Sequence, residues 1–208
     1  IKSSSIKLFA VPTTAGTGSE VTNFATIWDK KNKKKYSLLH DSLYPDVSII
    51  DPELTISLPL SHTISTGLDA INQAFESLWN KNANQETKTL AYESIALGLR
   101  ALPKLIENSK NLSARYSMCK SSHLAGLCIN KTRTAICHSI SYPITAYYDV
   151  PHGIACAFSM EAVIKLVKEQ DKDLYQDIEK NIDMGDLINN LKSLNKVTRF
   201  TTNCKSKV

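Results

Sequence analysis

The sequence predicts the end of an α/β unit over residues 1–58, followed by an all-α domain over residues 59–208. Two observations support this division. Up to Leu58 the apolar residues come in short runs that are rich in β-branched and aromatic side chains and are closed by turn residues, as in strands. From Pro59 onward the apolar residues recur at spacings of three and four, the period of helices that bury one face.

Four short segments of the first part are expected to be strands. Residues 6–11 are a mostly apolar run, which indicates a buried strand. Residues 22–28 and 36–39 lie on either side of a lysine-rich segment, so they predict a hairpin with a polar tip. Residues 47–50 form the last expected strand, which ends at an Asp-Pro pair.

Helices are expected throughout most of the second part. The first has an apolar stripe with spacings of three and four, formed by Leu68, Ile71, Phe75 and Leu78. The others are expected over residues 87–106, 114–129, 134–147 and 154–166. Pro103 allows the helix over residues 87–106 to divide into two. The tail after about Lys168 is polar, and residues 201–208 show no apolar periodicity.

Composition excludes several classes of protein. With 42% apolar and 22% charged residues the chain has ordinary globular composition, and no apolar run reaches the ~18 residues that a membrane span requires. The net charge is +5, and residues 30–35 contain five lysines, so the excess of positive charge lies in one turn. A nucleic-acid binder would spread its basic residues over a face, so nucleic-acid binding is not supported.

The number of cysteines is odd, and the sequence has neither a C-x-x-C pair nor a secretory segment. This predicts reduced thiols that pack in the core of a cytoplasmic protein. These cysteines are Cys119, Cys128, Cys137, Cys156 and Cys204.

Polar residues gather in a loop directly after the first expected strand. Residues 12–20 read Pro-Thr-Thr-Ala-Gly-Thr-Gly-Ser-Glu. The glycines allow a ligand to approach the backbone closely, and successive N–H groups and hydroxyls of this kind can hold a phosphate. The loop matches neither the P-loop nor the G-x-G-x-x-G pattern, so an ordinary turn is the competing interpretation.

Two groups of side chains could together hold a metal ion. Asp69 and Gln73 lie four residues apart on one expected helix face, with Glu76 a further turn along. His138 lies on a later helix, and His152 lies in a Pro-His-Gly turn. One oxygen ligand and two imidazoles are a plausible set for a transition metal. Taken singly, Asp69 can equally be a polar helix-start residue, and each histidine can have a purely structural role.

Together these motifs resemble the iron-containing, or group III, alcohol dehydrogenases. The resemblance extends over residues 9–160. The segments that carry it, in the order and at the spacing of that family, are residues 12–22, 51–54, 66–70 and 151–153. It implies that residues 1–58 are a remnant of a dinucleotide-binding domain and that residues 59–208 are an incomplete helical metal-binding domain, in the dehydroquinate synthase-like architecture.

The resemblance also implies cofactors and the residues that hold them. In this family NAD(P) exchanges a hydride while a divalent metal, Fe²⁺ or Zn²⁺, polarises the alcohol or aldehyde oxygen. The positions implied to contact NAD(P) are Thr13, Thr14, Thr22, Phe24, Lys35 and Leu54. The implied metal ligands are Asp69, Gln73, His138 and His152. Gln73 stands where the family has a histidine, and an amide oxygen is a weaker ligand than imidazole.

Three further positions indicate one branch of the family. Tyr142 replaces a histidine that many members have one turn after His138, and it is the candidate for delivering a proton to the alkoxide. Lys131 and Arg133 precede His138 in a segment that resembles the phosphonoacetaldehyde reductases, where they could hold a phosphonate dianion. Solvent-facing charges at a helix start are an equal alternative for both.

The resemblance predicts an NAD(P)-linked alcohol dehydrogenase or aldehyde reductase, with reduction of phosphonoacetaldehyde to 2-hydroxyethylphosphonate as the favoured reaction. The expected partner is a small-molecule substrate of this kind. Binding to nucleic acid or to a membrane is not expected, and the protein can be a homo-oligomer. The family's glycine-rich pyrophosphate loop would lie before Ile1 and the end of its helical domain beyond Val208, so a fragment truncated at both ends is expected. The alternative is a non-catalytic copy that serves only as a helical scaffold or oligomerisation unit.

Overall fold

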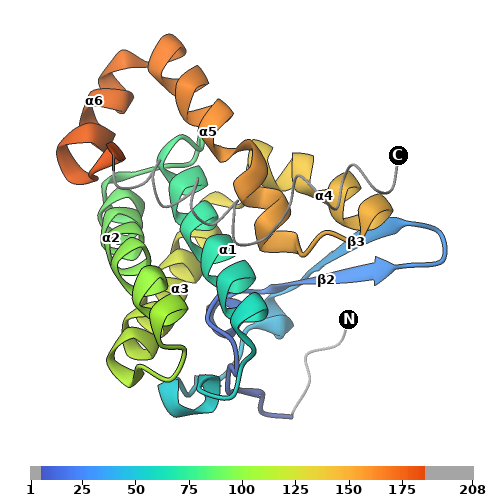
Figure 1. Cartoon of the computed structure of the whole chain (residues 1–208). Helices are drawn as coiled ribbons and strands as arrows, with labels where there is room; N and C mark the ends of the chain where they lie inside the picture. Colours follow the sequence, from blue (N-terminus) through green and yellow to red (C-terminus); the bar gives the residue numbers. More distant parts are fainter. Residues whose placement is uncertain (1–5, 186–208) are drawn as a thin grey trace.

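The computed structural model describes residues 6–185, and one helix lies at its centre (Figure 1). This helix, α1, spans Leu60–Leu78 and packs against α2, α3 and α5. Those three helices span Gln85–Glu107, Leu112–Thr132 and His152–Gln170. The stripe expected on α1 is confirmed, since Leu68, Ile71, Phe75 and Leu78 are each at most 2% exposed. Burial of side chains of this size contributes about 1.5–3 kcal/mol each, so α1 supplies much of the core.

Both interior prolines lie in continuous helices. Pro103 is near the end of α2, and Pro143 is inside α4, which spans Ile136–Tyr148 and packs against α5. A proline inside a helix removes a hydrogen bond and costs about 3 kcal/mol. The packing of α2 against α1 and α3 offsets that cost, and α2 stays one helix rather than dividing.

A sixth helix, α6, follows α5 and was not expected from the polar tail. It spans Lys172–Asn181 and packs against α5 (Figure 1). Tyr175 and Ile178 are its buried residues, and an apolar edge of two residues is too short to produce a recognisable period. Among residues 6–185 no helix combines the length and apolar character that crossing a bilayer requires.

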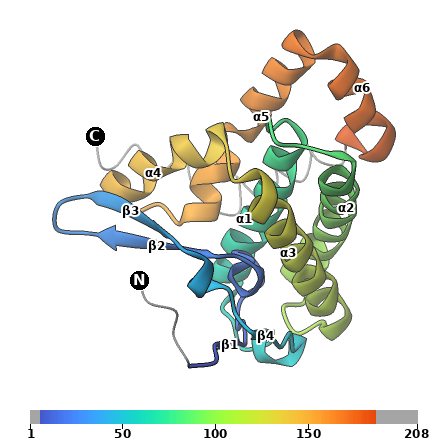
Figure 2. The ribbon, with the colours of Figure 1, turned by 180° about the vertical axis from the view of Figure 1, so that it is seen from behind.

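The N-terminal part forms two separate two-stranded sheets. β1, Phe9–Ala10, pairs in parallel with β4, Val47–Ser48, at the lower end of the molecule (Figure 2). β2, Phe24–Asp29, pairs antiparallel with β3, Lys34–Leu39. The predicted hairpin with a lysine-rich tip is therefore confirmed, and it extends away from the helices on the side where α4 lies (Figures 1 and 2).

The expectation that residues 6–11 are a buried strand is wrong. Ile6 is 80% exposed, Phe9 59% and Val11 45%. An almost purely apolar run is typical of a parallel strand that is covered on both faces within a full sheet. Here β1 pairs with β4 in a sheet of two strands, which leaves these side chains uncovered.

The loop after β1 is fixed to the helices by two glycines. A Cβ on Gly16 would lie 2.6 Å from the Cβ of Thr66 on α1. Gly18 has a φ of 58° and meets Gly126 of α3 so closely that a Cβ there would lie 2.4 Å from the Cα of that glycine. Only glycine combines this backbone conformation with so close an approach. The loop thus lies directly against both α1 and α3.

Other expectations are partly tested. Four cysteines are buried and free, as predicted, and the fifth, Cys204, lies outside the described residues. Residues 201–208 lie outside them as well. The division predicted between residues 58 and 59 stays a prediction; α1 begins just after it, at Leu60.

Candidate metal centre

Three predicted ligands from distant parts of the sequence meet in the structure. Oδ1 of Asp69, on α1, lies 3.2 Å from Nε2 of His138, on α4, and 3.9 Å from Nε2 of His152, on α5. The centroids of the two imidazole rings are 5.3 Å apart. Asp69 and His138 are buried and His152 is half-buried. The oxygen and the two nitrogens therefore face one small volume.

A close crossing of two helices places His152 beside Asp69. His152 is the first residue of α5, and Gly153 follows it. A Cβ on Gly153 would lie 1.8 Å from the carbonyl oxygen of Ser65 and 3.0 Å from the Cβ of Asp69. Since both Ser65 and Asp69 belong to α1, only a glycine allows α5 to begin in contact with α1. The glycine of the Pro-His-Gly turn is thus explained by packing.

Each imidazole is oriented by a second polar group. Nδ1 of His138 donates to Oε2 of Glu76 at 2.6 Å. Nδ1 of His152 lies 3.3 Å from Oγ of Ser141, which donates its own proton to the carbonyl oxygen of His138 and therefore accepts from His152. Both rings thus carry a proton on Nδ1 and direct Nε2 towards Asp69. Partners of this kind fix the tautomer and orientation of metal-binding histidines.

Glu76 also caps the helix that carries His138. Its carboxylate is fully buried and accepts the backbone N–H groups of Ala135, Cys137 and His138. The residue that precedes α4 provides no side-chain cap, so a residue of α1 satisfies the first N–H groups of α4. The negative charge also interacts favourably with the helix dipole. One carboxylate therefore sets both the start of α4 and the orientation of His138.

Burial and hydrogen bonding oppose each other in this pair. Burial alone would raise the pKa of Glu76, but the hydrogen bond and charge of His138 and the backbone N–H groups lower it below its ordinary value. Burial would likewise lower the pKa of His138, yet hydrogen bonds with Asp69, Cys156 and Glu76 raise it well above its ordinary value. A divalent ion binds neutral imidazole, so we expect metal affinity at this cluster to rise with pH.

A fourth donor, Cys156, lies one turn after His152 on α5. Its Sγ is 3.7 Å from Nε2 of His152. With Asp69, His138 and His152 it forms a set of ligand atoms that all lie within 4.8 Å of one another. Burial would raise the pKa of Cys156, but hydrogen bonds with the two histidines lower it below its ordinary value. By contrast, burial raises the pKa of Cys128 to about 12. Packing alone therefore does not describe Cys156.

Gln73 lies beside the cluster and binds Asp69. Its Nε2 donates to Oδ2 of Asp69 at 3.2 Å, which leaves Oδ1 for the histidines. Its Oε1 is buried and has no hydrogen-bond partner in the described part of the chain. Leaving a buried oxygen unsatisfied costs about 1–3 kcal/mol. A carboxylate, two oriented imidazoles and a thiol suit a divalent transition metal, so the residues present fit such an ion.

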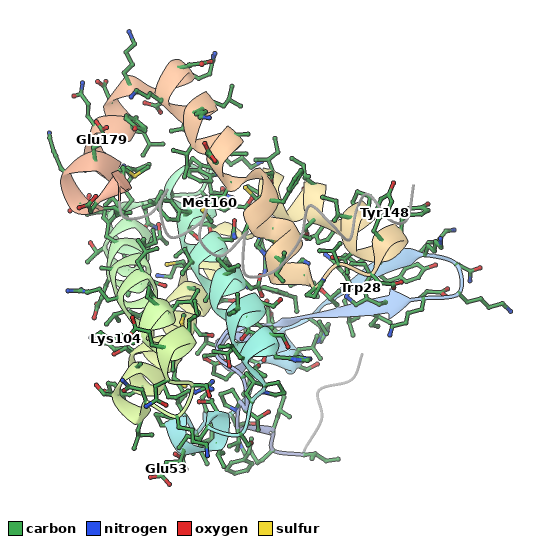
Figure 3. The ribbon with its side chains drawn as sticks, in the orientation of Figure 1. Trp28, Glu53, Lys104, Tyr148, Met160 and Glu179 are labelled. Atoms are coloured by element: carbon green, nitrogen blue, oxygen red, sulfur yellow. The ribbon has the colours of Figure 1, made fainter. Side chains whose placement is uncertain are left out.

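The cluster forms part of the wall of a cavity of about 510 Å³. The hairpin of β2 and β3 forms another part, and Trp28 lies on this hairpin, below α4 in Figure 3. The Trp28 ring packs edge-on at 6.3 Å from the ring of Tyr142 and 6.4 Å from that of His152. The volume and the mostly apolar wall with a few converging polar groups are typical of a small-molecule site.

Tyr142 and Lys35 both line this cavity and contact each other. The Tyr142 ring stacks on His152, with centroids 6.0 Å apart and an interplanar angle of 8°. Nζ of Lys35 lies 3.7 Å from the centroid of the Tyr142 ring, a cation–π contact worth about 0.5–1 kcal/mol at an exposed site. Among the lysines of residues 30–35, Lys35 is the one that lines the cavity. The hairpin therefore brings one positive charge next to the cluster.

Arg133 and Lys131 are placed differently. Arg133 lines the cavity, with its guanidinium carbon 5.1 Å from the centroid of the Phe24 ring and Nη1 3.5 Å from Oδ1 of Asn23. Lys131 forms an exposed ion pair with Glu86 and does not line the cavity. Arg133 therefore lines the same cavity as the candidate metal ligands, and Lys131 lies outside that cavity.

The backbone of Arg133 is unusual. This residue ends α3 with a φ of 69° and a ψ of 176°. That conformation is essentially restricted to glycine, and a larger residue there costs about 1–3 kcal/mol. Residues held in this way cluster at ligand-binding sites, where the surrounding structure compensates for the strain. The conformation of Arg133 is therefore a second indication that its placement matters for function.

The positions assigned to NAD(P) do not all meet in one pocket. Phe24 and Lys35 line the cavity. The other four lie elsewhere in the strand-and-loop part: Thr13 is exposed, Thr14 half-buried, Thr22 buried and Leu54 43% exposed. All six assignments stay predictions.

The structure adds three residues to the predicted ligands, and of these the sequence had pointed only to Glu76, as a neighbour of Asp69 on one expected helix face. Glu76 lies seven residues after Asp69, and Cys156 lies four after His152, so helical spacing alone placed each on the face of a predicted ligand. Trp28 gave no comparable signal. Its position depends on how the hairpin packs near α4, which no local pattern encodes.

Comparisons with known proteins agree with the motifs. The profile of the "Fe-containing alcohol dehydrogenase family, C-terminal" matches residues 63–206, and that of "Iron-containing alcohol dehydrogenase" matches residues 1–52. A curated relative, the probable alcohol dehydrogenase EutG of Escherichia coli, is 39% identical over 160 residues, which cover 77% of this chain and 40% of the relative. The phosphonoacetaldehyde reductase of Streptomyces viridochromogenes is 34% identical over 161 residues, again 77% of this chain and 40% of the relative.

The fold comparison leads to the same group. The crystal structure of sulfoacetaldehyde reductase from Bifidobacterium kashiwanohense, in complex with NAD⁺, matches with a TM-score of 0.82 and 32% identity, over 93% of this chain and 52% of that one. The chain thus spans about half the length of the proteins that it matches. The fold predicted from the sequence, a helical domain preceded by part of a dinucleotide-binding domain, is confirmed. Sequence profiles and fold together show that the chain belongs to the iron-containing alcohol dehydrogenase family.

Proposed function

We propose that the protein is an NAD(P)-linked, metal-dependent alcohol dehydrogenase or aldehyde reductase in which Asp69, His138 and His152 hold a divalent ion. The observation that carries this proposal is the convergence of these three side chains, with both imidazoles oriented, on the wall of one cavity. When bound, the metal would act as a Lewis acid on the carbonyl oxygen of the substrate, and NAD(P)H would supply the hydride. The activity of the whole protein is part of the proposal, because the chain covers 40% of the relative EutG.

The residues of the chain would enclose the substrate and move a proton. The rings of Trp28 and Tyr142 form an aromatic corner beside His152, which excludes water from the reacting atoms. The Tyr142 hydroxyl is the group that we propose to deliver a proton to the alkoxide oxygen. Its ring is held by the stacking on His152 and by the contact with Lys35, so the hydroxyl has a defined direction.

We further propose that the substrate is an aldehyde with a phosphonate group, as in phosphonoacetaldehyde. Arg133 supports this, because its guanidinium lines the cavity and its polar partner there is the neutral amide of Asn23. A guanidinium binds the oxygens of a phosphonate with two parallel hydrogen bonds. Two of the similar proteins are reductases of aldehydes that carry an acidic group, phosphonate in one and sulfonate in the other.

Replacing Arg133 by glutamine should lower kcat/KM for phosphonoacetaldehyde and leave that for butanal unchanged. Loss of charge-assisted hydrogen bonds of about 1.5–3 kcal/mol corresponds to a decrease of about 10- to 100-fold. The measurement is steady-state reduction of both aldehydes. Lys131→Gln is the matched control, because Lys131 lies outside the cavity, and it should change neither value.

Other outcomes would refute the substrate assignment in distinct ways. An equal decrease for both aldehydes in Arg133→Gln would mean that Arg133 does not recognise the phosphonate. A wild-type protein that reduces butanal as efficiently as phosphonoacetaldehyde would exclude an anionic substrate and leave the dehydrogenase proposal in place. A preference for sulfoacetaldehyde over phosphonoacetaldehyde would mean that the site recognises the monoanion of a sulfonate and not the dianion of a phosphonate.

A non-catalytic scaffold is the second candidate function. It is favoured by one observation, the glutamine at position 73 in place of the histidine of the family. A scaffold needs no metal ion. Metal content therefore separates the two candidates.

A further inference from the structure

We propose that Cys156 is the fourth protein ligand of the metal and that the site consists of Asp69, His138, His152 and Cys156. This inference rests on the proposed metal site and replaces Gln73 as the fourth ligand. The thiolate would supply the donor that the loss of a histidine at position 73 removes.

The spacing of the four donor atoms supports this set. Zinc in tetrahedral sites has bonds of about 2.0–2.3 Å, which separate its ligand atoms by about 3.3–3.8 Å. The separations along the cluster are 3.2 Å from Asp69 to His138, 3.9 Å from Asp69 to His152 and 3.7 Å from His152 to Cys156. All four atoms lie within 4.8 Å of one another. Only small side-chain adjustments would therefore bring the four donors onto one ion.

The fold holds Cys156 at this place independently of a metal. His152 and Cys156 lie four residues apart on α5, so their side chains share one face of the helix. Gly153 brings the start of this helix into contact with α1, which carries Asp69. Cys156 is fully buried, so bulk water does not reach the sulfur. The element that places His152 in the cluster thus places the sulfur there as well.

Gln73 has a different role in this arrangement. Its Nε2 donates to Oδ2 of Asp69 and so orients the carboxylate with Oδ1 towards the histidines. Each of the three ligands shared with the family then has its own positioning partner: Gln73 for Asp69, Glu76 for His138 and Ser141 for His152. A residue engaged in this way acts through Asp69 and does not need to contact the ion.

A thiolate changes which ion the site prefers. Sulfur is a soft ligand and favours Zn²⁺ over a hard ion, while an all-nitrogen-and-oxygen site accepts Fe²⁺ readily. A thiolate and a carboxylate also neutralise both charges of a divalent ion. We therefore expect Zn²⁺ to be the tightly bound metal.

Cobalt substitution tests the sulfur ligand without any assay of activity. Co²⁺ bound to a thiolate shows an intense sulfur-to-metal charge-transfer band in the near ultraviolet, and Co²⁺ bound only to nitrogen and oxygen does not. We expect this band in the purified wild-type protein and in Gln73→Ala. Cys156→Ser should lose the band and bind Co²⁺ about 10- to 100-fold more weakly or worse, the scale known for removing a partner of a metal ligand.

Cys137→Ser is the matched control, because Cys137 is equally buried and precedes His138 but lies outside the four-residue cluster. It should keep the band. Cobalt that binds to the wild type without the band, and is lost in Asp69→Ala, would overturn the role of Cys156 and leave the proposed metal site standing. Loss of the band in Gln73→Ala but not in Cys156→Ser would also overturn it. A wild type that binds no cobalt would refute both proposals.

A second measurement needs no variant. X-ray absorption at the zinc edge of the wild-type protein should show one sulfur at about 2.3 Å together with nitrogen and oxygen ligands. A ligand shell that contains only nitrogen and oxygen would contradict the proposal, whether or not Cys156→Ser folds.

Discussion

Replacing Glu76 by alanine should lower the free energy of unfolding by about 3–5 kcal/mol, the cost known for removing one partner of a buried ion pair. The loss is large because the carboxylate is fully buried and satisfies three backbone N–H groups as well as His138. Urea denaturation in the presence of a chelator measures it apart from metal binding. Glu76→Gln keeps the size of the side chain and one acceptor oxygen, so we expect a smaller loss of stability for it. Glu76→Ala should also weaken metal binding about 10- to 100-fold, because His138 loses its orienting partner.

The pH dependence gives this prediction a second readout. The pKa of Glu76 is lowered in the folded protein, so its contribution to stability is present above its unfolded-state pKa and is lost as the pH falls through the folded value. Wild type and Glu76→Gln should therefore converge in stability at acid pH. Glu93→Ala is the control, since Glu93 forms an exposed ion pair with Lys120 and its removal should cost less than about 1 kcal/mol. Equal effects of the two alanine variants would contradict the capping role of Glu76.

Replacing Gly153 by alanine should reduce metal affinity about 10- to 100-fold, the range seen when support for a metal ligand is lost. The added Cβ would lie 1.8 Å from the carbonyl oxygen of Ser65, so α5 must move away from α1. That movement separates His152 from Asp69. It should also cost about 1–3 kcal/mol of stability, as overpacking does. Calorimetric titration with Zn²⁺ and urea denaturation measure the two effects.

Gly98→Ala is the matched control for this variant. Gly98 lies on α2, and a Cβ there would meet Ile71 of α1 at 2.7 Å. The substitution therefore also crowds the core, but the atoms nearest to the added Cβ belong to Ile71 and Ser121 and not to the four candidate ligands. We expect a change in stability without a change in metal affinity. If Gly153→Ala binds Zn²⁺ as tightly as the wild type, the contact of α5 with α1 does not position His152.

Helical periodicity predicted the large helices well, because the residues that they bury recur at spacings of three and four in the sequence. The stripe of α1 is an example, with Ile71 and Phe75 fully buried. The same reasoning failed for residues 6–11, since apolar composition does not reveal how many strands will cover a segment. It also missed α6, whose buried edge consists of Tyr175 and Ile178 alone.

The site could be predicted only as separate pieces. Spacing placed Asp69 and Gln73 on one helix face, but nothing local linked them to His138, 69 positions away from Asp69. The family resemblance supplied that link. The roles of Glu76 and Cys156 depend on the packing of α1 against α4 and α5, so they required the structure.

Zinc titration shows whether Asp69, His138 and His152 form a metal centre. The wild-type protein, the Asp69→Ala variant and the Glu93→Ala control should be purified in parallel and titrated with Zn²⁺ after treatment with a chelator. We expect one tightly bound ion per chain in the wild type and the control, and no tight binding in Asp69→Ala, because Oδ1 of Asp69 faces both histidines. A wild-type chain without tight binding, or an Asp69→Ala variant that binds as the wild type does, would contradict the assignment of a metal centre to this cluster.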